Sequence, residues 1–70
     1  CGLAWYNLGV VCEDTDRLNE ALVCYERAVG AEPTLAAAHY NLALLYERMS
    51  RRRDALRHLA IYRKLSPRSR

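Results

Sequence analysis

Apolar residues in the first part of the chain recur three and four positions apart. The first stripe consists of Trp5, Leu8, Gly9 and Cys12, and a polar break with the sequence EDTD follows it. The second stripe consists of Leu18, Ala21, Leu22, Tyr25, Ala28 and Val29. This spacing places each set on one side of a helix with 3.6 residues per turn. Pro33 then ends the second helix because proline lacks a backbone N–H. The pattern predicts two helices joined by a short turn.

The same alternation returns in the second half of the chain. Its stripes are His39, Leu42, Ala43 and Tyr46, then Ala55, Leu56, Leu59 and Tyr62, with the break MSRR between them and Pro67 after them. No segment shows the apolar–polar alternation of period two that is typical of a strand. The sequence therefore predicts an all-α fold with four helices.

A shift of 34 residues aligns the two halves without a gap. The identical pairs are Ala4/Ala38, Tyr6/Tyr40, Asn7/Asn41, Leu8/Leu42, Glu13/Glu47, Arg17/Arg51, Ala21/Ala55, Leu22/Leu56 and Pro33/Pro67. Self-similarity at a fixed period of this length is typical of stacked helical repeats. We expect one domain over 1–70, with a first repeat at 2–35 and a second at 36–69.

The positions that carry this pattern resemble the tetratricopeptide repeat (TPR) family. They are Trp5, Leu8, Gly9, Ala21, Tyr25, Ala28 and Pro33 in the first repeat, and Leu42, Ala43, Tyr46, Ala55, Leu59 and Pro67 in the second. The resemblance implies two antiparallel helix-turn-helix hairpins stacked as a short right-handed solenoid. The chain departs from the family at Cys12, His39 and Tyr62. It also has Asp16 and Ser50 where the family usually ends its first helix with glycine.

The first helix of each repeat has a second face that pairing with its partner helix does not require. In the family this face lines a concave groove that binds extended peptides or helices. The resemblance therefore implies peptide binding by Tyr6, Asn7, Val10, Tyr40, Asn41 and Leu44. Asparagine can hold a peptide amide through a donor and an acceptor, and tyrosine offers rigid contact area. Alternatively, the two asparagines bond within the helix pair, and a neighbouring repeat is contacted by Leu3, Val10 and Leu44.

Charge is distributed unevenly along the chain. Residues 1–35 carry six acidic against two basic side chains, whereas residues 36–70 carry nine basic against two acidic ones. This asymmetry suits contact between unlike halves of two copies, or a phosphate-binding surface on the last helix. However, arginines at a helix start oppose the helix dipole, and no aromatic residues are interleaved with them to stack bases. Nucleic-acid contact is therefore the third hypothesis for function.

A stack of two repeats leaves apolar surface uncovered, since such folds normally need three or more units. Leu56, Leu59 and Leu65 on the last helix would lack a partner. We therefore expect either that the chain is a fragment of a longer protein or that copies associate. The leading hypothesis is a protein–protein interaction module that binds a partner in the groove. The runner-up is a structural self-association module without a peptide ligand.

The residues of catalytic or metal-binding type form no convergent set in the sequence. His39 stands at the place of Trp5, and we interpret it as a loosely packed core position that another chain helps to cover. His58 is expected on the outer, convex side. With Cys12 and Cys24 on other helix faces, we predict no enzyme activity, no metal and no cofactor. An odd number of cysteines and no apolar run of about 18 residues favour a reduced, cytoplasmic protein without a membrane contact.

Overall fold

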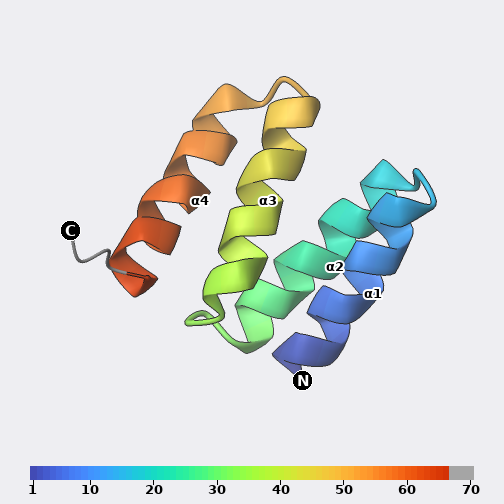
Figure 1. Ribbon diagram of the computed structural model, residues 1–70, viewed down its shortest axis with the longest axis horizontal. Helices are drawn as coiled ribbons and strands as arrows, with labels where there is room; N and C mark the ends of the chain where they lie inside the picture. The colour runs from blue at the N-terminus through green and yellow to red at the C-terminus, as the bar shows by residue number, and fades with distance from the viewer. Residues whose placement is uncertain (67–70) are drawn as a thin grey trace.

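The computed structural model describes residues 1–66, which form four helices and no strand. They are α1 (Gly2–Asp14), α2 (Leu18–Ala31), α3 (Ala36–Arg48) and α4 (Arg52–Leu65). The first two helices pair with each other, the last two do the same, and α2 packs against α3 (Figure 1). The prediction of an all-α fold built from two helix hairpins is confirmed. Pro67 lies outside the described residues.

The turns inside the two hairpins have the same backbone hydrogen bonds. Asp16 and Ser50 both have a φ of 62°, the left-handed conformation. After α1, the amide of Arg17 donates to the Cys12 carbonyl at 2.7 Å, and the Asp16 amide donates to the Glu13 carbonyl. The turn after α3 repeats both bonds 34 residues later. This is the Schellman arrangement that ends many helices, and it is formed although neither residue is glycine.

The helices of the first hairpin cross closely at Gly9. A Cβ built on Gly9 would lie 2.6 Å from Cε1 of Tyr25, closer than carbon atoms pack. Tyr25 is completely buried, so the ring has no free space into which to move. In the second repeat the equivalents are Ala43 and Leu59, and the smaller leucine is compatible with one additional carbon on α3. The small residue is thus required by the size of the side chain opposite.

The core lies mainly at the contact between the two hairpins. The largest fully buried side chains are Tyr25 from α2 and Leu42 and Leu45 from α3. Other members of the same buried cluster are Cys12, Ala21, Cys24, Tyr46 and Ala55. Burial of side chains of this size stabilises the fold by about 1.5–3 kcal/mol each. The two repeats therefore form a single core rather than two separate ones.

Two expectations about the packing stripes are wrong. Leu8 was expected to pack the first hairpin, but it is 47% exposed, whereas its equivalent Leu42 is fully buried. The reason is that Leu42 faces the other hairpin and Leu8 faces away from it. His39 is not a loose position either, because it is 4% exposed and is covered within the same chain. Trp5 is less buried, and the guanidinium of Arg27 lies 5.0 Å from its ring centroid.

The expected scatter of histidines and cysteines is also wrong. His58 was placed on the outer side, but it is 4% exposed and its Nδ1 lies 3.0 Å from Nδ1 of His39. Cys24 is buried as well, and its side chain interacts with that of Cys12 across the first hairpin. His58 is therefore on the side of α4 that packs against α3, where it contacts His39 and Tyr46, and not on the outer side.

Candidate functional site

The residues expected to line the groove lie on α1 and α3, and we call this surface the α1–α3 face. Among its six residues Asn7, Tyr40 and Leu44 are exposed, and Tyr6, Val10 and Asn41 are partly buried. Tyr40 is 40% exposed and Leu44 is 46% exposed. The Tyr40 ring packs against Tyr62 of α4 with the ring centroids 4.9 Å apart. The exposed half of the face thus combines an amide, an aromatic ring and an aliphatic side chain.

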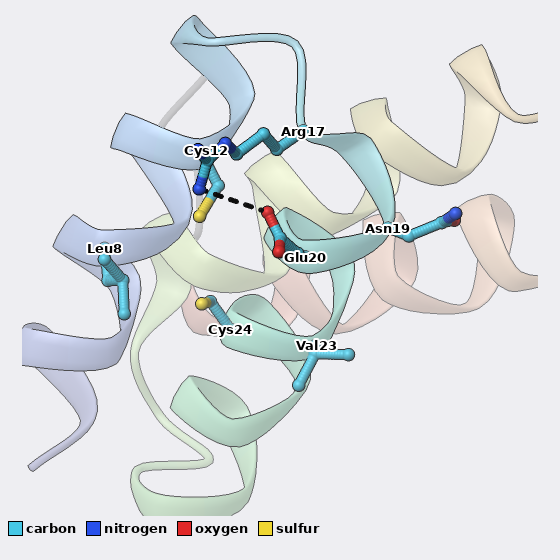
Figure 2. A pocket seen from close by; sticks show the side chains of 7 residues that line it. All are labelled: Leu8, Cys12, Arg17, Asn19, Glu20, Val23 and Cys24. Atoms are coloured by element: carbon cyan, nitrogen blue, oxygen red, sulfur yellow. Dashed lines mark ion pairs between the residues drawn. The ribbon is translucent and has the colours of Figure 1, made fainter.

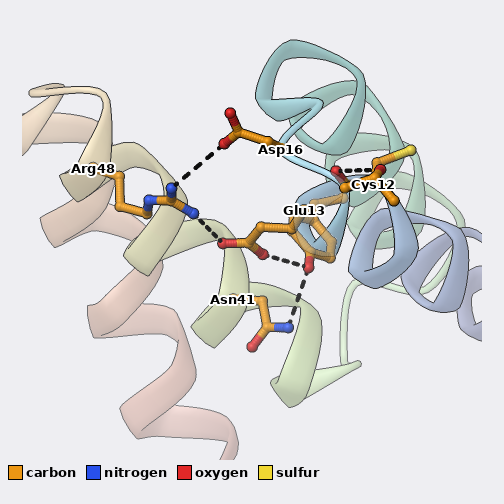
Figure 3. A network of polar contacts seen from close by, with 7 residues as sticks. Cys12, Glu13, Asp16, Asn41 and Arg48 are labelled. Carbon is orange, nitrogen blue, oxygen red and sulfur yellow. Dashed lines mark hydrogen bonds and ion pairs between the residues drawn. The ribbon is translucent and has the colours of Figure 1, made fainter.

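A polar network joins the two repeats beneath this face (Figure 3). The Tyr25 hydroxyl donates to Glu13 Oε1 at 2.8 Å. It therefore accepts the 3.3 Å bond from Asn41 Nδ2, which also reaches the Tyr6 hydroxyl at 3.3 Å. From α3, Arg48 Nη1 donates to Glu13 Oε2 at 3.3 Å. Glu13 and Asn41 therefore stabilise the position of α3 against the first hairpin.

The surroundings of Tyr25 favour its neutral form. Burial, followed by the hydrogen bond to the Glu13 carboxylate, raises the pKa of Tyr25 well above its usual value. Arg48 lies between two carboxylates, with Asp16 Oδ1 at 4.0 Å from its second guanidinium nitrogen. Since the Arg48 and Asp16 side chains are more than half exposed, the Asp16 contact contributes little to stability. The Glu13 contact is the more protected of the two.

The two asparagines that the sequence treats alike have different surroundings. Asn41 uses its amide nitrogen for bonds to two tyrosines, whereas Asn7 is exposed. Asn41 thus bonds to the first hairpin and not within its own helix pair, which was the alternative expected for both asparagines. No signal in the sequence predicted that Glu13 of α1 and Arg48 of α3 pair. Tyr25 was assigned to the packing stripe, and its hydroxyl became part of the network.

A second surface lies between the two helices of the first hairpin (Figure 2). It is an open apolar groove of about 500 Å³ between α1 and α2. Its lining residues are Leu8, Cys12, Arg17, Asn19, Glu20, Val23 and Cys24. Leu8 and Val23 are about half exposed, while burial raises the pKa of the Cys24 thiol at the base. Sequence reasoning missed this groove because the stripe of Leu8 was assigned to packing within the hairpin.

The remaining candidates are mostly more buried than expected. Of the three leucines on α4 that were expected to lack a partner, Leu56 is 58% exposed, whereas Leu59 and Leu65 are partly buried. Residues 1–66 contain no group of three or more His, Cys, Asp or Glu side chains that could hold a metal ion. Within the same described part, no helix has the length and apolar character needed to cross a membrane. The three cysteines are free thiols.

These features define a class of protein. Two helix hairpins related by 34 residues, with matching Schellman turns and a shared core, are a tandem helical-repeat array. A family model described as TPR repeat matches residues 12–50, which is more than half of the chain. The chain belongs to the tetratricopeptide repeat family, whose members are generally protein–protein interaction modules.

The chain is also similar to a protein described as a peroxisomal targeting signal receptor from Eremothecium gossypii. The two are 36% identical over 55 residues, which cover 79% of this chain. The same region covers 10% of the receptor. The chain thus spans about a tenth of that receptor's length, and the similarity concerns the repeat region that it matches.

Proposed function

We propose that this protein binds a peptide or helix of a protein partner along the α1–α3 face. The observation that carries the proposal is the exposure of Asn7, Tyr40 and Leu44 on one face of two helices that the Glu13 network holds together. Rigid aromatic and amide groups on a preorganised surface suit recognition of a peptide, because little ordering entropy is lost on binding. The similarity to a targeting signal receptor supports a role of this kind. A cytoplasmic location is part of the same proposal.

The test uses peptides selected from a random display library on the immobilised chain, with affinities measured by fluorescence anisotropy. Tyr40→Ala and Asn7→Ala are expected to weaken binding about tenfold or more, as central interface residues do. Asn41→Ala is unsuitable alone, since it also removes two bonds inside the stack.

Leu44→Ala is a third test variant, and Leu56→Ala is its matched control. Both leucines are about half exposed, but Leu44 lies on the α1–α3 face and Leu56 lies on α4. Only Leu44→Ala should weaken binding. Equal affinities for the wild type and all the α1–α3 variants would contradict the proposal.

Self-association is the second candidate function. It is favoured by apolar residues that are exposed on α1, whereas their equivalents on α3 are buried. Leu42 and Leu45 of α3 are fully buried against the first hairpin. Their equivalents on α1, Leu8 and Val11, are 47% and 57% exposed. The outer side of α1 therefore exposes apolar residues of the kind that α3 buries in the contact between the hairpins. On α4, Leu56 adds exposed apolar surface.

Charge opposes the simplest stack of this kind. Suppose that α1 of a second copy docked on the second hairpin of the first copy, as α3 docks on the first hairpin within one chain. Asp14 of the second copy would then take the place of Arg48, and Glu47 of the first copy would take the place of Glu13. An attractive pair inside the chain would become a repulsive pair between copies.

Sedimentation velocity at micromolar concentration separates these effects. Asp14→Arg is expected to increase association relative to the wild type, and Leu8→Glu is expected to prevent it. A monomer for both the wild type and Asp14→Arg would reject self-association in this geometry.

A further inference from the structure

The two histidines form a buried chain of polar contacts inside the second repeat. His39 Nε2 lies 2.8 Å from the Pro33 carbonyl oxygen, in the connection between α2 and α3. His39 Nδ1 lies 3.0 Å from Nδ1 of His58 on α4, and the two ring planes differ by 28°. Nε2 of His58 is buried and has no hydrogen-bond partner among residues 1–66. The pair thus links the last helix to the segment that joins the repeats.

These contacts determine the position of each proton in the neutral pair. A carbonyl oxygen only accepts, so His39 carries its proton on Nε2. Its Nδ1 then has a lone pair and accepts a hydrogen bond from Nδ1–H of His58. A neutral His58 with its proton on Nδ1 has a lone pair on Nε2, which is the atom without a partner. The neutral state therefore satisfies three of the four ring nitrogens.

Addition of protons weakens this arrangement in two steps. The first added proton places a positive charge in a site where both rings are 4% exposed, and it leaves an N–H on His58 Nε2 with no described acceptor. A second added proton would put hydrogens on both facing Nδ1 atoms, which lie 3.0 Å apart. Since neither nitrogen could then accept, the contact between α3 and α4 would be lost.

The surrounding charges only partly compensate a proton on His58. From α2, Glu26 favours the charged form, but its carboxylate is hydrogen-bonded to the Tyr46 hydroxyl of α3. On α4, Asp54 favours the charge weakly, because it is paired with Arg51 and Arg57. His39 and Arg57 both oppose it. Burial acts first, and these groups together hold the pKa of His58 below its usual value of 6.5.

We propose that the His39–His58 pair is an acid-sensitive latch that holds α4 against α3 while both rings are neutral and releases α4 when the pair is protonated. An unfolded or released histidine has a pKa near 6.5, so it binds more protons than the buried one as the pH falls. The latch is therefore fully closed above about pH 6.5 and weakens below it. The chain contains no other histidine, so no other side chain of ordinary pKa titrates in this interval.

Release of α4 would also alter the α1–α3 face. Tyr40 follows His39 directly, and its ring packs on Tyr62 of α4. When α4 moves away, Tyr40 loses this contact and with it the fixed position of its ring. This consequence rests on the proposed function of the face, whereas the latch itself does not.

The first experiment reads the tautomers of the wild-type chain by long-range ¹H–¹⁵N NMR at pH 7.5. We expect both rings to be neutral, with the proton of His39 on Nε2 and that of His58 on Nδ1. This measurement needs no substitution, so it does not depend on the folding of a variant. A proton on Nε2 of His58, or a charged ring at this pH, would overturn the latch.

The second experiment follows amide hydrogen exchange between pH 7.5 and 5.5, with each rate divided by the intrinsic rate at the same pH. A released histidine with a pKa near 6.5 is half protonated at pH 6.5 and almost fully protonated at pH 5.5, so the protection of α4 amides is expected to fall about fivefold between these pH values. Amides of α1 and α2 serve as the internal control and should change much less. Protection of α4 that does not depend on pH, or an equal loss in all four helices, would overturn the proposal.

His58→Asn is the matched variant. Its side-chain amide nitrogen can take the place of the Nδ1 donor, and after rotation its oxygen can accept from a protonated His39. We expect protection of α4 in this variant to change less than about threefold over the same pH unit. A loss as large as that of the wild type would show that the pair does not cause it. Peptide binding measured at both pH values separates failure of the latch from failure of the proposed function.

Discussion

Two glycines on neighbouring helices show how differently single residues are constrained in this fold. Gly9 faces the buried Tyr25 ring, and a Cβ there would lie 2.6 Å from a ring carbon. For Gly30, near the end of α2, no atom of residues 1–66 apart from the surrounding backbone of the same helix and the two chain neighbours lies within 4 Å of the place where its Cβ would stand. Gly9 is therefore required by the side chain opposite it. At Gly30 no neighbour requires glycine, and the residue only destabilises the helix through its backbone entropy.

Gly9→Ala is expected to lower the free energy of unfolding by about 1–3 kcal/mol, since the fully buried Tyr25 has no room to adjust. Gly30→Ala should raise it by about 0.5–1 kcal/mol, because alanine favours the helix and contacts nothing. Urea unfolding followed by circular dichroism measures both. Equal effects of the two substitutions would mean that the close contact at Gly9 relaxes without cost.

Trp5 and His39 mark the limit of prediction for single residues. Their shared place in the repeat predicted a core position for His39, and His39 is 4% exposed. However, the repeat could not show that His39 meets His58, because the equivalents of this pair in the first repeat are Trp5 and Cys24. A helical projection describes one helix, and the contact involves two helices and the Pro33 carbonyl.

At the scale of the elements, the two turns adopt the same conformation with different residues. Asp16 and Ser50 both have φ near 62°, where a Cβ is unfavourable. Aspartate tolerates this region better than serine, since its short side chain can hydrogen-bond locally. The hydrogen bonds that close each helix compensate for the strain. The family's preference for glycine at this position has the same physical origin.

Ser50→Gly is expected to raise the free energy of unfolding by about 0.5–1 kcal/mol, because relief of the Cβ strain exceeds the added entropy of the unfolded chain. Asp16→Gly should have a smaller effect, since aspartate already tolerates the conformation. Thermal unfolding of the two variants beside the wild type gives the comparison. A lower melting temperature for Ser50→Gly would show that its side chain has another stabilising role.

For the whole molecule, position in the stack decides what a repeated residue does. Leu42 is fully buried between the hairpins, whereas its equivalent Leu8 is 47% exposed beside the apolar groove. Asn41 bonds to two tyrosines, and its equivalent Asn7 is exposed. The two repeats are alike in sequence but have different neighbours. In the described chain α3 packs against the preceding hairpin, whereas α1 has no preceding hairpin to pack against.

Leu42→Ala is expected to lower the free energy of unfolding by about 2–5 kcal/mol, the usual cost of a cavity at a fully buried leucine. Leu8→Ala should cost less than about 1 kcal/mol in the monomer, since water already reaches this side chain. Urea unfolding at low protein concentration measures both without interference from association. A cost for Leu8→Ala close to that for Leu42→Ala would contradict the difference in burial between the two positions.

The 34-residue period, the apolar stripes and the turn positions are local features of the chain, so they were sufficient to predict four helices in two hairpins. They also predicted that Tyr40 and Leu44 share one face of α3, because residues four positions apart lie on the same side of a helix. The inward positions of Asn41 and His58, the pairing of Glu13 with Arg48 and the exposure of Leu8 were not predictable in this way. Each depends on which helix lies opposite, and that is a property of the packed molecule, in which distant parts of the chain compete for the same buried space.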